Sequence, residues 1–301
     1  IIGHEFSGRV IEVGSRVRGL EVGQTVTAEG HIYCGDCYLC RNGEAHICAN
    51  LKLVGFDYPG AFAEYIAVPA SNVVCLEGVP LAFGAIADPL GNALHSTGKA
   101  PLFNADVLIT GCGPIGLMTI MLVKIAGARR VFATDISPYR VDRAKDLGAN
   151  CALNPADTDV DSLVITKTVR SSGVDVWFEM SGSVDALEQG FHLLRPGGHA
   201  VLLGLPKTDF AFDIANELIA KGITVHGVVG RELYRTWNQV GRLLRSHRSE
   251  VRRGLKSIIT HRLRLEDFQQ GFDLMKAGGC GKVLMFLDPE IVQEDTPGMP
   301  G

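Results

Sequence analysis

The sequence predicts an α/β protein in which a small all-β barrel precedes a parallel sheet covered by helices on both faces. The first part, to about residue 95, is rich in Gly, Val and turn residues and holds short runs typical of β-strands. From about residue 104, short apolar runs alternate with helical stretches of about 10–15 residues, as in a parallel sheet. A length of 301 residues suits two domains of about 150 residues each.

Each expected element follows from the apolar pattern of its own stretch. In the all-β part, strands are expected at residues 10–14, 24–27 and 62–68. In the sheet, the pattern predicts strands at 107–110, 131–134, 174–178, 199–203 and 223–228, with helices at 115–126, 138–147 and 183–194. The last part should form helices at 237–244 and 266–276, strands at 258–261 and 282–287, and a basic surface loop at 246–256. The Pro- and Gly-bearing tail from residue 288 is predicted to be disordered.

Composition and charge exclude several classes of partner. Hydrophobic residues make up 46% and charged residues 21%, as in an ordinary globular protein. The net charge of −4 gives no reason to expect nucleic acid or a membrane surface as partner. No apolar run approaches the roughly 20 residues that span a bilayer. The start at Ile1 shows neither a signal-peptide pattern nor an initiator Met, so we expect the chain to begin partway through a longer protein.

Half of the eight cysteines crowd into one short segment. Cys34, Cys37, Cys40 and Cys48 follow the spacing C-x2-C-x2-C-x7-C. Four thiolates on one loop suit the tetrahedral coordination of Zn²⁺, with no position left open for chemistry. Iron–sulfur clusters also take four thiolates, but with other spacings, and the remaining alternatives are disulfides or free thiols. The cluster therefore predicts a structural zinc site, and it favours a reducing, cytoplasmic location.

A glycine-rich turn follows the strand expected at 107–110. Gly111, Gly113 and Gly116 fit the pattern G-x-G-x-x-G, whose glycines allow a tight turn, close approach of a pyrophosphate and close helix packing. Asp135 ends the next strand, about 20 residues on, where a carboxylate binds a ribose 2′-hydroxyl and repels a 2′-phosphate. Arg140 then either stacks on adenine or lies on a solvated helix face. The alternative for the whole pattern is a purely structural turn; the full context favours a Rossmann fold that binds NAD.

A Gly-His-Glu triplet, Gly3 to Glu5, stands about 30 residues before the cysteine loop. The order of this triplet, the cysteine loop, Asp88-Pro89 and the Rossmann glycines resembles the zinc-dependent medium-chain alcohol dehydrogenase family, to about residue 287. Further stretches are similar to the branch of that family that oxidises L-threonine, namely residues 29–32, 88–93, 179–182, 230–232, 258–262 and 267–273.

The resemblance implies a domain organisation and a site. A GroES-like catalytic domain would cover residues 1–97, incomplete at its N-terminus, and a Rossmann NAD-binding domain 98–235. The chain would return to the catalytic domain over 236–290 and end in a flexible tail, 291–301. His4 and Glu5 would ligate a catalytic zinc, with Asp88 beside it as an outer ligand or relay group. The cofactor would be lined by Ile115, Leu203, Gly204, Leu205, Val228 and Val229, beside Asp135 and Arg140.

The implied reaction is the NAD-dependent oxidation of an alcohol, and with L-threonine the product would be 2-amino-3-oxobutanoate. A bound zinc would lower the pKa of the substrate hydroxyl, and a hydride would pass to the nicotinamide. In the family a cysteine ligand and a proton relay precede the Gly-His-Glu triplet. We therefore expect both upstream of Ile1, and a second zinc only in a longer chain. The resemblance also implies a homotetramer, while His31 is either a substrate-pocket residue or a plain loop histidine.

Two other functions remain open at this point. A zinc-dependent polyol or butanediol dehydrogenase would share the fold, both kinds of zinc site and NAD. An inactive truncated homologue would bind NAD and structural zinc without turnover. Comparing activity on threonine with activity on sorbitol or 2,3-butanediol distinguishes the polyol or butanediol dehydrogenase from the threonine-oxidising enzyme. A zinc count with one turnover assay distinguishes the inactive homologue from an active enzyme.

Overall fold

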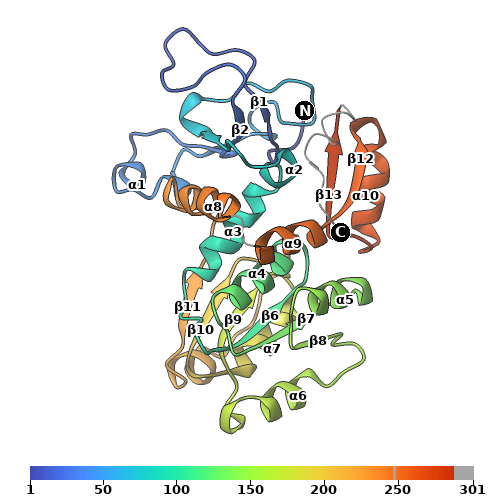
Figure 1. Cartoon of the computed structure of the whole chain (residues 1–301). Coiled ribbons are helices and arrows are strands. Elements are labelled where there is room, and N and C mark those ends of the chain that lie inside the picture. Colours follow the sequence, from blue (N-terminus) through green and yellow to red (C-terminus); the bar gives the residue numbers. More distant parts are fainter. Residues whose placement is uncertain (247–248, 288–301) are drawn as a thin grey trace.

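The computed structural model describes residues 1–246 and 249–287, and it shows two regions bridged by helix α3 (Ala87–Thr97) (Figure 1). The β-rich N-terminal part lies at one end, and a large sheet with its helices lies at the other. The C-terminal elements, in orange and red, return to the N-terminal part. The predicted disorder of the tail, from residue 288 and including the flexible end at 291–301, concerns positions outside the described residues.

The large sheet has six parallel strands in the order β11-β10-β9-β6-β7-β8. Their bounds are β6 Asp106–Thr110, β7 Arg130–Thr134, β8 Cys151–Leu153, β9 Val174–Glu179, β10 Leu194–Leu202 and β11 Thr224–Gly227. Counted along the chain from β6, this is the strand order 3-2-1-4-5-6 of a doubly wound dinucleotide-binding fold. The predicted Rossmann sheet is confirmed. The order reverses between β6 and β9, so a ligand crevice belongs at the carboxyl ends of these two strands.

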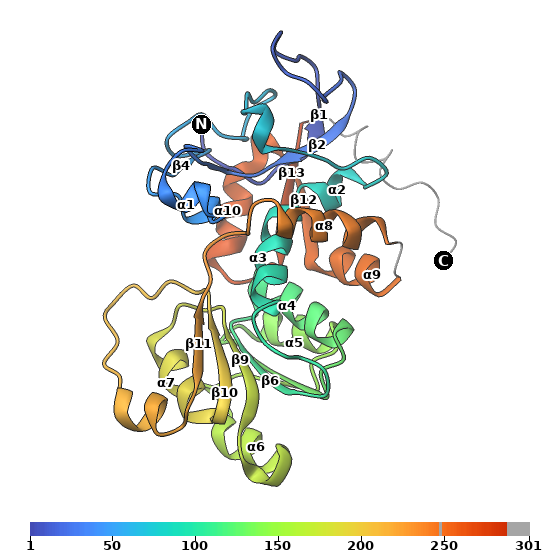
Figure 2. The ribbon, with the colours of Figure 1, turned by 90° about the vertical axis from the view of Figure 1, so that its left-hand side faces the viewer.

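Helices cover both faces of this sheet. α4 (Pro114–Ile125) and α5 (Pro138–Asp146) lie on one side and α7 (Val184–Leu193) on the other (Figure 2), with α6 (Val160–Lys167) packed against α7. Pro114 opens α4 at a position where no N–H is needed. Ser137 caps α5, because its hydroxyl oxygen accepts a hydrogen bond from the Arg140 N–H. Local sequence signals thus place the helices next to the strand ends.

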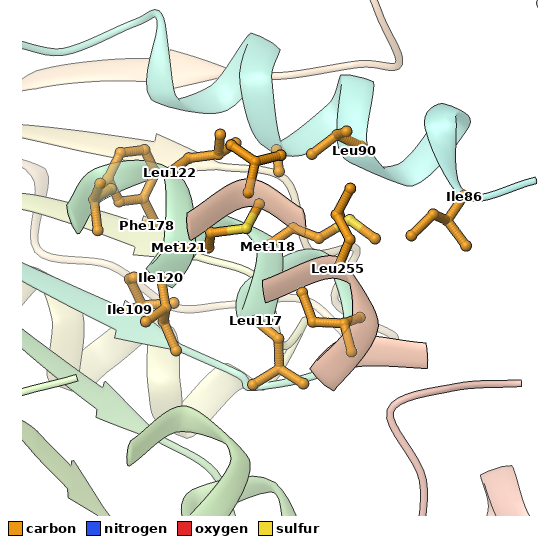
Figure 3. Close-up of a cluster of buried hydrophobic side chains, with 14 of the residues drawn as sticks. Ile86, Leu90, Ile109, Leu117, Met118, Ile120, Met121, Leu122, Phe178 and Leu255 are labelled. Atoms are coloured by element: carbon orange, nitrogen blue, oxygen red, sulfur yellow. The ribbon is translucent and has the colours of Figure 1, made fainter. Parts of the chain in front are cut away.

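The main core lies where α4 is covered by α3 (Ala87–Thr97) and α9 (Ser249–Ile258) (Figure 3). Leu117 and Met118 of α4, Leu90 of α3 and Leu255 of α9 are fully buried there. α4 is apolar all round because it contacts the sheet on one side and other helices on the opposite side. This core joins three segments far apart in the chain, so it fixes α3 against the nucleotide-binding part.

The N-terminal part contains two small antiparallel sheets. β1 (Gly8–Arg9), β2 (Thr25–Ala28) and β5 (Val73–Cys75) form one, and β3 (His31–Ile32) pairs with β4 (Lys52–Leu53) in the other. The strand predicted at 24–27 is confirmed, but those at 10–14 and 62–68 are wrong. Val10 bonds to the backbone of Gly23 and Gln24, and the Phe62 N–H donates to the Ile2 oxygen, but neither contact extends into a strand ladder. An alternating pattern produces a buried face, but a strand also needs a neighbour.

The prediction that this part is all-β as far as residue 95 is also wrong. It holds the short helices α1 (Tyr38–Arg41) and α2 (Leu81–Gly84) and the three-turn helix α3. Pro89 resembles a helix breaker, yet it lies in the first turn of α3, where its missing N–H has no helical partner. Ile86, Leu90 and Ala93 recur at helical spacing and are fully buried.

The C-terminal part holds α8 (Arg235–Arg245), α9, β12 (Ile259–Arg264), α10 (Phe268–Lys276) and β13 (Lys282–Phe286), and β12 pairs with β13 in parallel. The helices and strands predicted here are confirmed. The basic surface loop predicted at 246–256 is wrong, since its described residues from Ser249 onward belong to α9. Val251, Leu255 and Ile258 line one buried face of α9, and the basic residues crowd the rest. None of the helices in the described ranges has the length and apolar character of a membrane crossing.

Candidate active site and nucleotide crevice

The four clustered cysteines converge in the loop that follows β3. Their sulfur atoms all lie within 4.8 Å of one another. The Sγ atoms are 3.5 Å apart for Cys34 and Cys48 and for Cys37 and Cys40, 3.8 Å for Cys37 and Cys48, and 4.0 Å for Cys34 and Cys40. None of the four forms a disulfide. Sulfurs about 2.3 Å from a tetrahedral Zn²⁺ would be roughly 3.8 Å apart, so this donor set fits one zinc ion.

Backbone N–H groups of the same loop stabilise thiolates in the cluster. The Cys37 N–H donates to Cys34 Sγ at 3.4 Å, and the Asn50 N–H donates to Cys48 Sγ at 3.3 Å. Hydrogen bonds from the backbone N–H groups of Asp36 and Cys37 lower the pKa of Cys34 to about 6. Metals bind the thiolate form, so these N–H groups favour ligation by Cys34.

A second group of metal-ligand side chains lies where the N-terminal segment meets α3. His4, Glu5 and Asp88 each place one ligand atom within 4.8 Å of the others. Asp88 is 2% exposed, and its Oδ2 has no hydrogen-bond partner among the described residues. Burial raises the pKa of Asp88 to about 7. Burial also lowers the pKa of His4, which favours the neutral imidazole that binds metals. One imidazole with two carboxylates is a donor set that suits Zn²⁺.

Arg231, which follows β11, is buried among acidic side chains. Its guanidinium binds both oxygens of Glu29, with Nε 3.0 Å from Oε2. Its Nη1 donates to Asp88 Oδ1 at 2.7 Å and to Asn92 Oδ1 at 3.0 Å. Burial alone would raise the pKa of Glu29, but hydrogen bonds from His31 and Arg231 hold that pKa well below its usual range. Asp88 is thereby fixed by one oxygen while the other stays free.

Glu5 has a partner from the far end of the chain. Lys282, the first residue of β13, forms a short ion pair with Glu5 Oε2. The Lys282 side chain is 20% exposed and the Glu5 side chain 28%, so the pair is largely shielded from solvent. Each carboxylate of the candidate metal pocket thus has its own cation, Arg231 for Asp88 and Lys282 for Glu5.

The predicted glycine turn lies at the carboxyl end of β6. Gly111 has φ +92°, and a Cβ there would lie 2.7 Å from the backbone nitrogen of Ser181, so only glycine fits. A Cβ on Gly116 would lie 1.9 Å from the Gly111 oxygen. A Cβ on Gly113 would meet no described atom within 4 Å. Open space therefore lies before the N-terminus of α4, where backbone N–H groups favour an anion.

Asp135 follows β7 directly beside this turn. Its Oδ2 accepts a hydrogen bond from the Cys112 N–H and its Oδ1 from the Ser137 N–H, both at 2.8 Å. Arg140 Nη1 lies 3.9 Å from Asp135 Oδ2, and Arg140 Nε is buried without a hydrogen-bond partner in the described part of the chain. The carboxylate is held in place by backbone, and the guanidinium beside it keeps donors free.

The other predicted cofactor residues lie at the same edge of the sheet. Leu203, Gly204 and Leu205 follow β10, Val228 and Val229 follow β11, and Ile115 opens α4 after the glycine turn. The backbone N–H groups of Leu203 and Gly204 donate to the backbone carbonyl oxygen of Glu179, at 3.0 and 3.1 Å. Leu205 and Val229 are 87% and 53% exposed, while Val228 is buried. The structure therefore brings these residues together at the carboxyl edge.

Sequence reasoning missed Arg231 and Lys282 as members of the site. Arg231 stands in a stretch that resembles the family, but nothing in that stretch indicates which carboxylates it binds. Lys282 was visible only as the start of a strand. His31, with two interpretations open, belongs to the buried charge network, since its Nδ1 lies 2.7 Å from Glu29 Oε1 and 3.1 Å from Arg231 Nη2.

Comparison with known families agrees with this fold. The alcohol dehydrogenase GroES-like domain matches residues 1–78, and the zinc-binding dehydrogenase domain matches residues 114–246. The chain belongs to the zinc-binding alcohol dehydrogenase family.

Individual relatives narrow the comparison. The chain is 44% identical to the L-threonine 3-dehydrogenase of Caldanaerobacter subterraneus subsp. tengcongensis over 95% of its own length and 81% of the relative. It is 43% identical to the L-threonine 3-dehydrogenase of Pyrococcus abyssi, over 95% of its own length and 82% of that relative.

Solved structures give the same fold. The alcohol dehydrogenase TADH from Thermus sp. ATN1 matches with a TM-score of 0.85 and 28% identity, covering 95% of this chain and 83% of that one. The short chain alcohol dehydrogenase of E. coli CFT073 complexed with NADH matches with a TM-score of 0.84 and 26% identity, covering 95% of this chain and 83% of that one. The 2R,3R-butanediol dehydrogenase of Bacillus subtilis matches with a TM-score of 0.83 and 27% identity, covering 95% of this chain and 80% of that one.

Proposed function

We propose that this chain oxidises the hydroxyl of L-threonine to 2-amino-3-oxobutanoate, with NAD as the hydride acceptor. The identity of 44% to an L-threonine 3-dehydrogenase across 95% of the chain carries the proposal. The grouping of His4, Glu5 and Asp88, beside a sheet edge built for a dinucleotide, supports it from the structure.

The two clusters would hold zinc in two different roles. Cys34, Cys37, Cys40 and Cys48 fill all four positions of a tetrahedral ion, which makes that zinc structural. His4 and Glu5 would hold the catalytic zinc, with the free Oδ2 of Asp88 beside it. A zinc ion bound there supplies Lewis acidity, which lowers the pKa of an alcohol hydroxyl. Arg231 keeps Asp88 in place through Oδ1, so Oδ2 remains available as an acceptor near the hydroxyl.

The cofactor would lie along the carboxyl edge of the large sheet. The turn from Gly111 to Gly116 offers its backbone N–H groups to the pyrophosphate, with the open space at Gly113 in front. Asp135, fixed by two backbone N–H groups, would bind the ribose hydroxyls and disfavour a 2′-phosphate, so we propose NAD rather than NADP. Leu205 and Val229 offer exposed apolar side chains to the nicotinamide half, whose ring supplies the hydride chemistry.

A butanediol dehydrogenase is the second candidate, because a solved butanediol dehydrogenase shares this fold at 27% identity. NADH formation should be measured with zinc, NAD and one of three substrates: L-threonine, 2,3-butanediol or sorbitol. The protein assayed should include the upstream segment in which the family resemblance places the cysteine ligand and the proton relay. We expect the highest kcat/KM with L-threonine. A higher value with 2,3-butanediol would transfer the assignment to the second candidate. Zinc and NAD binding without turnover of any substrate would instead indicate a non-catalytic homologue.

We further propose, from the family resemblance, a cytoplasmic homotetramer in which residues 1–97 and 236–290 form the catalytic domain and 98–235 the NAD-binding domain. Light scattering of the purified protein measures the assembly mass. Limited proteolysis tests the boundaries near residues 97 and 235.

A further inference from the structure

The side chain of Glu179, the last residue of β9, has no role in the function proposed above. We propose that its buried charge strengthens the binding of oxidised NAD, whose nicotinamide ring is a cation, relative to NADH, whose ring is neutral. This inference rests on the proposed function in one respect, since it requires that the crevice at the sheet edge binds NAD.

The Glu179 side chain is fully buried, and only one of its two oxygens has partners. The residue is 0% exposed. Its Oε1 accepts hydrogen bonds from the backbone N–H groups of Ser181 and Gly182, at 2.7 and 3.0 Å, and from the Ser181 hydroxyl. Its Oε2 is buried and has no hydrogen-bond partner in the part of the chain that the structure describes. Three donors suit a carboxylate, which only accepts, and its second oxygen keeps uncompensated negative charge.

The oxygen without a partner lies directly behind the segment that borders the crevice. A Cβ on Gly204 would lie 2.2 Å from Glu179 Oε2. The carboxylate therefore has room only because position 204 has no side chain. Gly204 belongs to residues 203–205, which were predicted to line the cofactor. The negative charge thus lies against the inner side of that segment, where its backbone separates it from the crevice.

The strand order indicates which half of the cofactor lies nearest. β9 is the first strand of the second half of the sheet and pairs with β10, whereas β7, which precedes Asp135, belongs to the first half. A dinucleotide lies across the point where the order reverses. With Asp135 at the adenosine ribose, the nicotinamide half extends over the ends of β9 and β10. Glu179 is therefore a buried charge on the nicotinamide side.

A negative charge at this place acts differently on the two oxidation states of the cofactor. The ring of oxidised NAD carries a positive charge, and acceptance of a hydride removes it. Because Glu179 is buried, solvent screens its attraction for that charge only weakly. Both forms share the same pyrophosphate, riboses and adenine, so those contacts largely cancel in the ratio of the two dissociation constants. Loss of the charge should therefore weaken oxidised NAD more than NADH.

A purely structural role makes a different prediction. If Glu179 only held the turn at Ser181 and Gly182 in place, its loss would disturb the crevice for both forms of the cofactor. Both dissociation constants would then rise by the same factor. The ratio of the two constants separates these roles, and it requires no turnover.

The test is Glu179→Gln in the full chain, because the amide keeps the size of the side chain and one acceptor oxygen. The Kd for NADH is measured from its fluorescence, and the Kd for oxidised NAD from its displacement of NADH. We expect the Kd for oxidised NAD to rise about tenfold relative to that for NADH. Tenfold corresponds to about 1.4 kcal/mol, which two unit charges reach even about 12 Å apart at an effective dielectric constant of about 20.

Two control variants separate charge from packing. Glu188→Gln removes the same charge at an exposed position on α7 and should leave the ratio unchanged. Glu179→Asp keeps the charge and should keep the ratio near the parent value, although a shorter side chain weakens both forms. Equal weakening of both forms in Glu179→Gln, or a ratio equal to that of Glu188→Gln, would overturn the inference.

Two other outcomes are also decisive. Should Glu179→Gln not fold, Glu179→Met, which is neutral and of similar length, is measured in the same way and should give the same shift in the ratio. If the parent binds neither form of the cofactor, the assignment of the crevice in the proposed function fails, and this inference fails with it.

Discussion

Replacing Arg231 with Met tests the buried charge network that positions Asp88. Arg231 and Glu29 are 2% and 1% exposed, and the guanidinium binds Glu29 and Asp88 together. Trp237 completes the surroundings, because its Nε1 donates to Glu29 Oε2 at 2.7 Å and its ring lies 5.5 Å from the guanidinium. Met roughly matches the length of the arginine stem but leaves two buried carboxylates without their cation.

The expected loss of stability is large. Removing one partner of a buried ion pair costs about 3–5 kcal/mol, because the remaining charge has lost both solvent and partner. At roughly 2–4 °C per kcal/mol for a domain of this size, the melting temperature should fall by about 6–20 °C. Restoring charge balance with the double variant Arg231→Met/Glu29→Gln should recover part of the loss, since one stranded carboxylate is then neutral.

The loss should also depend on pH in a defined direction. In the parent the pKa of Glu29 is held below its usual range, so its contribution is present above the unfolded pKa of about 4.3 and is lost as pH falls through the lower folded value. In the variant, burial acts without the guanidinium and the pKa of Glu29 rises. The Glu29 part of the difference in unfolding free energy is therefore fully present above the raised pKa and shrinks as the pH falls toward about 4. Asp88, whose pKa is about 7 beside Arg231, adds a further loss that grows as the pH rises above neutral.

Urea unfolding followed by tryptophan fluorescence at several pH values measures these free energies. Arg235→Met is the matched control, because Arg235 is 76% exposed and forms a surface ion pair with Glu232 at 3.4 Å. We expect less than about 1 kcal/mol for that change. The reasoning would be refuted if Arg231→Met were as stable as Arg235→Met. A loss of unfolding free energy that does not vary with pH would refute it as well.

Three further predictions follow from the same geometry. Cys37→Ser should remove one zinc per chain and destabilise the loop, since the apparent zinc-binding free energy of such sites is roughly 10–16 kcal/mol. Cys75→Ser, at an exposed cysteine outside the cluster, should leave the zinc count unchanged, and an unaltered count in Cys37→Ser would contradict the site. Asp135→Ser should shift the NAD/NADP preference about tenfold or more toward NADP, from a lost charged hydrogen bond of about 1.5–3 kcal/mol, and titrations with an unmoved ratio would rule this out. Gly116→Ala should abolish measurable NAD binding in calorimetry, because its Cβ would lie 1.9 Å from the Gly111 oxygen; parental affinity would argue against the turn as the phosphate site.

Features set by local sequence were predictable. The glycine turn, the strand ends and the cysteine spacing each depend on neighbouring residues, so the Rossmann sheet and the cysteine cluster followed from the sequence. The grouping of His4, Glu5 and Asp88 followed only from the family resemblance. α3 and α9 were missed because Pro89 and a run of basic residues masked an apolar helical spacing that becomes evident only against α4.

The cations of the metal pocket could not be predicted for a different reason. Arg231 and Glu29 are 202 residues apart, and Lys282 and Glu5 are 277 apart. Such pairs exist only after two regions of the chain have docked. No spacing rule connects them, because the docking depends on the packing of α3 and β13 and not on any short motif.

α3 limits how this chain could be recombined with its relatives. Its first turn carries Asp88 toward the N-terminal part, whereas its buried Leu90 and Ala93 belong to the core that contains α4. A chimera joined just after residue 97 would bring a foreign helix onto α4 and force mismatched apolar surfaces together. A chimera joined before residue 86 would separate Asp88 from its own Glu5 and His4. Exchange of halves between homologues should therefore succeed only when α3, α4 and α9 are transferred as one block.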